Sequence, residues 1–90
     1  MKAIVTVIGK DRVGIIAEVS SQLAELNLNI NDINQTVMQN DFFTMVMLAD
    51  VSKSSVSFGE ISDRLAAKGK EMGLSIKIQL EDIFNAMHRI

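Results

Sequence analysis

The chain contains no cysteine, proline, tryptophan or tyrosine among its 90 residues. Without cysteine it can form neither disulfides nor thiolate metal sites, and nothing indicates an oxidising compartment. The lack of proline, of low-complexity runs and of flexible linkers predicts a single domain over residues 1–90. The apolar run near the amino terminus ends at Ile8, before charged residues 10–12, so it is too short for a signal peptide or a membrane span. We therefore expect a cytoplasmic protein without a membrane partner.

Basic charge and aromatic side chains are also scarce. Nine lysine and arginine residues stand against eleven aspartate and glutamate residues, which gives a formal net charge of −2. Nucleic-acid binding depends on a basic surface, and single-strand binding also needs aromatic platforms for the bases. Only Phe42, Phe43 and Lys77 begin to supply such a surface. We therefore expect no nucleic-acid partner.

Groups that could perform catalysis are few. The single histidine, His88, stands far in sequence from any base or orienting group, and nucleophilic catalysis needs such groups within reach of one another. No set of histidine and acidic residues has the spacing of metal ligands. Gly9 and Gly14 match the start of a phosphate-binding loop, but Ile15 and Ile16 replace the lysine and the hydroxyl residue that it needs. The sequence thus predicts no enzyme, no metal site and no cofactor.

The first third of the chain predicts a strand followed by an amphipathic helix. The β-branched run at 2–8 is typical of a central strand. Asp11 offers a helix N-cap, and Asn27 tolerates the left-handed conformation found just past a helix end. Apolar residues at three- and four-residue steps predict about four helical turns between them. The expected buried face consists of Ile16, Val19, Leu23 and Leu26.

The middle of the chain predicts a hairpin. Residues 29–39 form a polar strand and residues 42–51 a strongly apolar one. Asn40 and Asp41 stand where a two-residue turn would join them, although the favoured pairs carry glycine second.

A second helix and a last strand complete the pattern. Ser57 and Glu60 have the spacing of a capping box, and Gly73 is expected to end the helix. Residues 74–81 alternate apolar and polar side chains, as in a strand with one buried face. The buried stripe of the helix is expected to contain Phe58, Ile61, Leu65 and Met72.

The order β-α-β-β-α-β predicts an α+β, ferredoxin-like fold, with a four-stranded antiparallel sheet and two helices on one face. Residues 1–81 would form its core. The tail at 82–90 has apolar residues spaced for a short helix and is expected to dock on the domain or on a partner chain.

The segment 9–15 carries the clearest chemical signal. A helix start leaves free backbone N–H groups beside a partial positive charge, which can hold a carboxylate, while the carboxylate of Asp11 can receive an ammonium group. A zwitterionic amino acid meets both demands. Asn29 and Asn31 are expected near the same end of the sheet, where their amides could bind either end of the ligand. In the alternative interpretation, Asp11 is only a cap and Gly14 only a close-packing position.

Two motifs resemble the ACT domain, a small regulatory module of amino-acid metabolism. They are D-R-V-G-I-I at 11–16 and L-N-L-N-I-N-D-I at 26–33. The resemblance covers residues 1 to about 81. The whole chain, including the tail, is also similar to small free-standing bacterial ACT proteins of unassigned function. The family usually has glycine where Asn27 stands, and asparagine can adopt the same backbone conformation.

The resemblance implies a homodimer that senses an amino acid or a similar small metabolite. The ligand would lie between the first loop of one copy and the start of the second strand of the other. Because no catalytic or DNA-binding domain is attached, the regulated partner would be a separate protein. The alternative is a structural dimerisation module without a ligand. The implied ligand-binding residues are Asp11, Arg12, Val13, Gly14, Asn29 and Asn31.

Overall fold

Four strands and two helices follow one another in the predicted order. The computed structural model describes residues 1–82, so most of the predicted helical tail, together with His88, lies outside the described residues. Neither helix in this part of the chain has the length and apolar content needed to cross a bilayer. The elements are β1 (Lys2–Lys10), α1 (Ile15–Glu25), β2 (Asn29–Val37), β3 (Phe42–Asp50), α2 (Phe58–Met72) and β4 (Leu74–Leu80).

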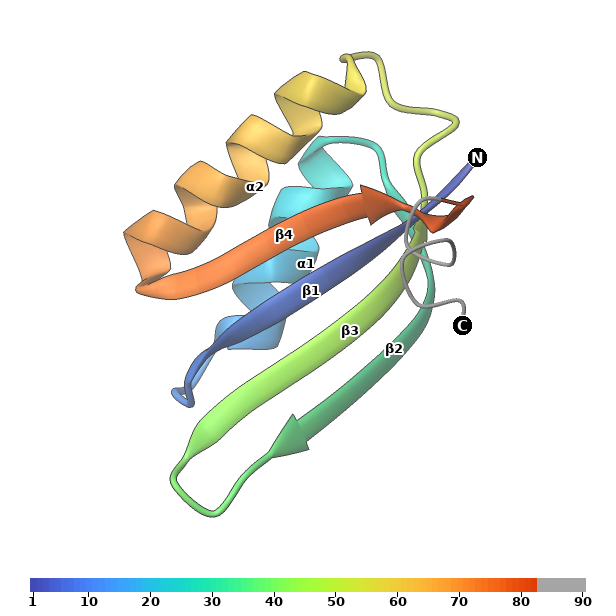
Figure 1. Cartoon of the computed structure of the whole chain (residues 1–90). Coiled ribbons are helices and arrows are strands. Elements are labelled where there is room, and N and C mark those ends of the chain that lie inside the picture. The colour runs from blue at the N-terminus through green and yellow to red at the C-terminus, as the bar shows by residue number, and fades with distance from the viewer. Residues whose placement is uncertain (83–90) are drawn as a thin grey trace.

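The strands form one antiparallel sheet in the order β2-β3-β1-β4, and both helices lie on the same face of it (Figure 1). This arrangement confirms the ferredoxin-like prediction. The core lies between the sheet and the helices, and it includes Val5, Val7, Met45 and Met47. Phe43 belongs to this core, whereas Phe42 is exposed.

The start of α1 differs from the prediction. β1 extends to Lys10, and the backbone N–H of Asp11 donates to the carbonyl of Asp41 at 2.7 Å. The helix therefore begins only at Ile15, after Gly14, which has a φ of 91° and provides no side-chain cap. An N-cap side chain reaches the second or third helical N–H, which Asp11 is too far back to do. The prediction of an aspartate cap was wrong.

The buried face of α1 is set by this later start. Ile15, Val19 and Leu23 are buried at four-residue steps, whereas Ile16 is 38% exposed. The prediction that Ile16 is buried was therefore wrong by one residue. The end of the helix was predicted correctly, since Asn27 has a φ of 63°.

The boundaries of α2 confirm the local signals. The hydroxyl of Ser57 accepts a hydrogen bond from the backbone N–H of Glu60 at 3.1 Å. Gly73 ends the helix with a φ of 74°. Ile61 and Leu65 are fully buried, while the outer two positions of the predicted stripe are partly buried.

The β2–β3 connection is longer than the predicted two residues, because four residues, 38–41, separate the two strands; the innermost three form the hairpin loop. The N–H of Met38 donates to the carbonyl of Phe42 at 2.9 Å, and the N–H of Asp41 donates to the carbonyl of Met38 at 3.0 Å. Asp41 has a φ of 59°, as expected for the last residue of a three-residue hairpin loop. β2 therefore ends at Val37, two residues earlier than predicted.

Candidate functional site

The loop between β1 and α1 leaves backbone donors free. The first helical hydrogen bond runs from the N–H of Glu18 to the carbonyl of Gly14 at 3.0 Å. The N–H groups of residues 15–17 precede it and have no partner within the helix. Together with the positive end of the helix dipole, these N–H groups can donate hydrogen bonds to an anion bound beside Asp11.

Arg12 is held against the helix rather than free in solvent. One guanidinium nitrogen lies 2.8 Å from the carboxylate of Glu18, and the other donates to the carbonyl of Val13 at 3.2 Å. This ion pair places the positive charge over the first turn of α1. The side chain of Val13 is 95% exposed, so an apolar group protrudes from the loop without cover.

The loop forms one side of a hollow of about 590 Å³, here called the loop pocket. Its opposite side comes from the second half of β2 and the start of β3. The pocket therefore combines one carboxylate, one guanidinium and an apolar wall. Its lining residues are Asp11, Arg12, Gly14, Ile15, Ile16, Ala17, Gln35, Val37 and Phe43.

Asn29 and Asn31 lie at the other end of the sheet. Asn29 pairs with Asp50, which pairs with Lys2, so the start of β2 lies beside the start of β1. The loop pocket follows the end of β1, about 26 Å away at roughly 3.3 Å per strand residue. The expectation that these asparagines lie near the loop of the same chain was wrong. β2 runs parallel to β1, because each of them is antiparallel to β3.

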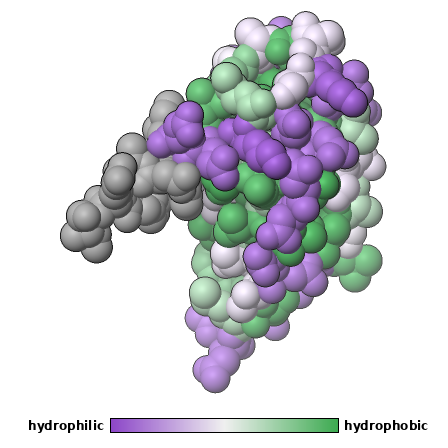
Figure 2. All heavy atoms as spheres, turned by 90° about the vertical axis from the view of Figure 1, so that its right-hand side faces the viewer, coloured by the Kyte–Doolittle hydropathy of each residue, from purple (hydrophilic) through white to green (hydrophobic). Residues whose placement is uncertain are grey.

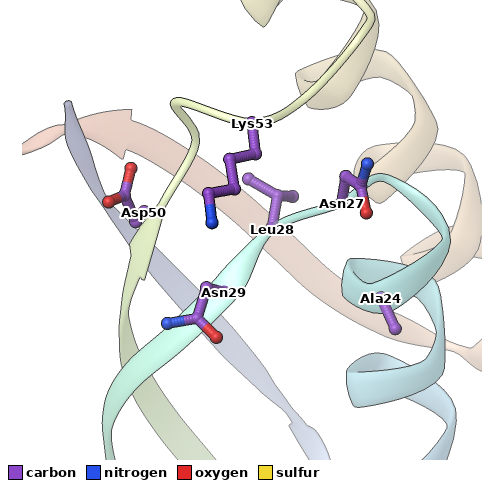
Figure 3. Close-up of a pocket in the computed structure, with 6 residues that line it drawn as sticks. All are labelled: Ala24, Asn27, Leu28, Asn29, Asp50 and Lys53. Atoms are coloured by element: carbon purple, nitrogen blue, oxygen red, sulfur yellow. The ribbon is translucent and has the colours of Figure 1, made fainter.

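Asn29 instead lines a second hollow, of about 470 Å³, here called the Lys53 hollow. It lies where the end of α1, the start of β2 and the β3–α2 loop meet (Figure 3). The side chain of Lys53 extends from that loop towards the space between Asp50 and Asn29, as Figure 3 shows. The lining residues are Ala24, Asn27, Leu28, Asn29, Asp50 and Lys53.

Asp50 is engaged by neighbours other than Lys53. One of its carboxylate oxygens accepts the backbone N–H of Ser52 at 2.9 Å and the hydroxyl of Ser52 at 2.5 Å. The ammonium group of Met1 lies 3.6 Å from the same oxygen. The Ser52 hydroxyl, followed by the Ser52 N–H, lowers the pKa of Asp50 below its ordinary value. Asp50 is therefore ionised throughout the neutral pH range.

The sequence missed the residues that complete both hollows. Gln35 and Val37 reach the loop pocket through the pairing of β2 with β3, and Lys53 reaches its hollow through the path of a loop. Neither the strand pairing nor the path of the loop can be inferred from the spacing of residues along the sequence. The alternation of polar and apolar residues in 29–37, mapped onto a ferredoxin-like strand order, could have placed Val37 beside the first loop. No local signal marks Lys53.

Gly14 supports a prediction about the loop. Its φ of 91° disfavours an L side chain, while a Cβ atom added there would meet nothing within 4 Å. Replacing Gly14 with alanine is expected to lower the free energy of unfolding by about 1 kcal/mol, entirely from the backbone cost. Urea denaturation measures this loss. Gly14→Asn should lose less, because asparagine tolerates the left-handed region, and an unchanged alanine variant would contradict the assignment.

Comparisons with known proteins agree with this architecture. The ACT domain family profile matches residues 2–79. A UPF0237 protein of Clostridium acetobutylicum is 62% identical over 90 residues, which is 100% of both chains. A UPF0237 protein of Methanopyrus kandleri is 52% identical over 89 residues, 99% of this chain and 98% of its own. An ACT domain protein from Streptococcus pneumoniae has a TM-score of 0.82 and 44% identity, over 93% of each chain. The chain belongs to the ACT domain family.

Proposed function

We propose that this chain is a non-catalytic regulatory module that pairs with a second copy, binds an amino acid in the loop pocket and regulates a separate protein. Members of the ACT family are regulatory and bind amino acids. The observation that carries the proposal is the position of the loop pocket, which is lined by Gln35 and Val37 of β2, the outermost strand of the sheet in the described residues.

The outer edge of β2 favours pairing with another copy. β2 is the first strand of the sheet, so one row of its backbone groups has no partner strand among the described residues. Ile33 is 40% and Val37 51% exposed, and both share the helix side of the sheet with their buried β3 neighbours. Figure 2, which views the molecule from the right of Figure 1, shows hydrophobic residues exposed among hydrophilic ones. A second copy would cover this surface.

Symmetry supports a site shared between the copies. Most homodimers have a two-fold axis. If two β2 strands pair antiparallel about such an axis, the end at Val37 of one copy lies near the start at Asn29 of the other. This pairing would bring Asn29 and Asn31 of one copy to the loop pocket of its partner. In such a dimer, the distance between the asparagines and the loop pocket of the same chain is consistent with a site that the two copies share.

The chemistry of the pocket suits a zwitterion. The free N–H groups of residues 15–17 would hold the α-carboxylate, and Asp11 would accept the α-ammonium. The amide of Asn29 from the other copy can donate to the first group or accept from the second. The apolar wall around Ile16 and Val37 would contact the ligand's side chain.

A thermal-shift screen of the common amino acids at millimolar concentration tests the proposal. One or a few L-amino acids should raise the melting temperature. A ligand at ten times its dissociation constant stabilises the folded state by about 1.4 kcal/mol, which amounts to several degrees for a domain of this size. Asp11→Ala or Asn29→Ala should abolish the shift. Asp63→Ala, which removes an exposed carboxylate on α2, should leave it unchanged.

A flat response across the whole panel, with the dimer intact, would contradict the sensor proposal. It would favour the second candidate function, a structural dimerisation module that binds no small molecule. The exposed side chains of Val13, Ile33 and Val37 support that candidate equally, because they only require a protein surface to cover them. The ligand screen therefore separates two functions that share the same dimer.

A further inference from the structure

We propose that the carboxyl-terminal segment 83–90 packs as a short helix across the open face of its own sheet, the face opposite α1 and α2. The inference goes beyond the proposed function, because the loop pocket lies on the helix side, where the buried Phe43 forms part of its wall. Both α1 and α2 lie behind the sheet in Figure 1, so neither covers the open face. The sheet therefore has room for one further element on this side.

The open face has an apolar centre. Ile8, Phe42 and Val46 are 38%, 40% and 38% exposed. Ile4 and Leu48 are partly buried between them. Each of these residues alternates along its strand with buried core residues, so its side chain points away from the helices. A cluster of large apolar side chains on one exposed face marks a surface that another element covers.

β4 brings the tail to one end of a row of residues that crosses this face. Gln79 of β4 pairs with Ile4 of β1. Ile4 pairs with Leu48 of β3, which pairs with Asp32 of β2. Residues that pair directly share one face of a sheet, so these four form a single row from β4 to β2. The chain leaves β4 directly after this row begins, and residues 81–82 are already helical.

The length of the remaining chain fits the width of the sheet. Three strand spacings separate β4 from β2, which is about 14 Å. A helix over residues 81–90 would be about 15 Å long. The apolar residues of the tail recur with helical spacing and would lie along one side of such a helix, where they can cover the row. They are Ile83, Phe84, Met87 and Ile90.

The charges of the two surfaces run in opposite order. On the open face, β1 and β4 bear Lys2 and Lys77, whereas β2 bears Asp32. Along the tail, the acidic residues 81–82 come first and the basic Arg89 comes near the end. A helix laid from β4 towards β2 would bring its acidic start near the lysines and Arg89 near Asp32. This complementarity fixes the direction in which the tail crosses the sheet.

Attachment favours the tail over any other occupant of the open face. A segment joined to the edge of its docking surface by a short connection has a millimolar effective concentration there. A second copy of the chain at micromolar concentration competes poorly with it. The regulated protein of the proposed function would then bind to another surface.

Thermal unfolding of full-length variants tests the docking of the tail. Phe84→Asp should lower the melting temperature by at least about 4 °C, because an aromatic side chain loses its burial against the sheet. Asn85→Asp introduces the same charge on the opposite side of the tail helix, so it is the matched control and should leave the melting temperature unchanged. Equal melting temperatures for the two variants would overturn the proposal.

Cross-linking identifies the chain on which the tail docks. Because the protein has no cysteine, two introduced cysteines can be joined selectively. With Leu48→Cys on β3 and Met87→Cys in the tail, a short bismaleimide should link the two positions within one chain, which mass spectrometry detects as one chain plus one linker. Asp63→Cys, on the exposed side of α2, combined with Met87→Cys is the matched control and should not be linked within the chain.

Two outcomes of the cross-linking would contradict docking on the same chain. Linkage between two chains would place the tail on a second copy, and equal linkage of the two cysteine pairs would leave the tail without a fixed site. Either result, or the absence of linkage between the cysteines on β3 and in the tail, would overturn the proposal.

Discussion

Replacing Gly69 with valine is expected to lower the free energy of unfolding by about 3 kcal/mol, the upper end of what overpacking a filled core costs. Gly69 is buried in α2 where the helix crosses β4. A Cβ atom there would lie 2.8 Å from the carbonyl oxygen of Leu74 and 3.1 Å from the backbone nitrogen of Ile76. Both atoms belong to a strand paired with β1, so neither can move without shifting the sheet. Valine would add two further carbons to this contact.

Urea denaturation of Gly69→Val beside the wild type measures this loss. A substitution at Gly59 provides the matched control. Gly59 lies on the same helix, but a Cβ atom there would meet only the hydroxyl of Ser57 at 3.9 Å. Gly59→Ala should therefore leave stability unchanged or raise it by up to about 1 kcal/mol, because alanine favours the helix. Equal midpoints for Gly69→Val and the wild type would show that α2 can move away from β4.

Features governed by neighbouring residues were predicted well. The cap at Ser57, the left-handed Asn27 and the stop at Gly73 each depend on side-chain and backbone preferences within four residues. The ferredoxin-like fold followed from the sequence of elements, because a β-α-β-β-α-β chain has few ways to cover one face of a sheet. These rules were enough to define the fold.

Features governed by distant residues were not predictable in the same way. Asp11 resembles a cap locally, but its N–H bonds to Asp41 on the β2–β3 connection, and the helix starts later. Gly69 lies on the apolar stripe of α2, where spacing alone does not distinguish a close helix–strand contact from a weak helical position. Asn29 lies far from the first loop of its own chain because β1 and β2 are both antiparallel to β3 and therefore run parallel to each other. The sequence therefore predicted the two groups of candidate site residues, the first loop and the start of β2, but not how far apart they lie in one chain.

If the proposed dimer forms through β2, introducing lysine at both Ile33 and Val37 is expected to convert it into a monomer at micromolar concentration. Both side chains lie on the exposed edge strand, and neither is part of the buried core. Across a two-fold axis the double variant places four new positive charges in one interface and removes apolar surface that pairing would bury. Losing that burial costs several kcal/mol, so the dimerisation constant should weaken more than a hundredfold. Sedimentation velocity over a concentration series measures the change.

Val46→Lys provides the matched control for this surface. Val46 is 38% exposed on β3, but it alternates with the buried Met45 and Met47 and so faces away from the helices. Lysine there should leave pairing through β2 unchanged. A monomer produced by Val46→Lys, with a dimer retained in the double variant, would place the interface on the opposite face of the sheet.

The single variant Ile33→Lys tests whether ligand binding and pairing are linked. Of the two substituted residues, only Val37 lines the loop pocket, whereas Ile33 lies outside it. Ile33→Lys alone therefore isolates the effect of pairing. If the amino acid bridges the loop of one copy and Asn29 of the other, a monomeric Ile33→Lys chain should lose the amino-acid thermal shift although every pocket residue is intact. By reciprocal linkage, the amino acid should tighten the dimer of the wild-type chain by the same factor. A monomer that still responds to the amino acid would mean that the loop pocket binds its ligand without the partner's asparagine.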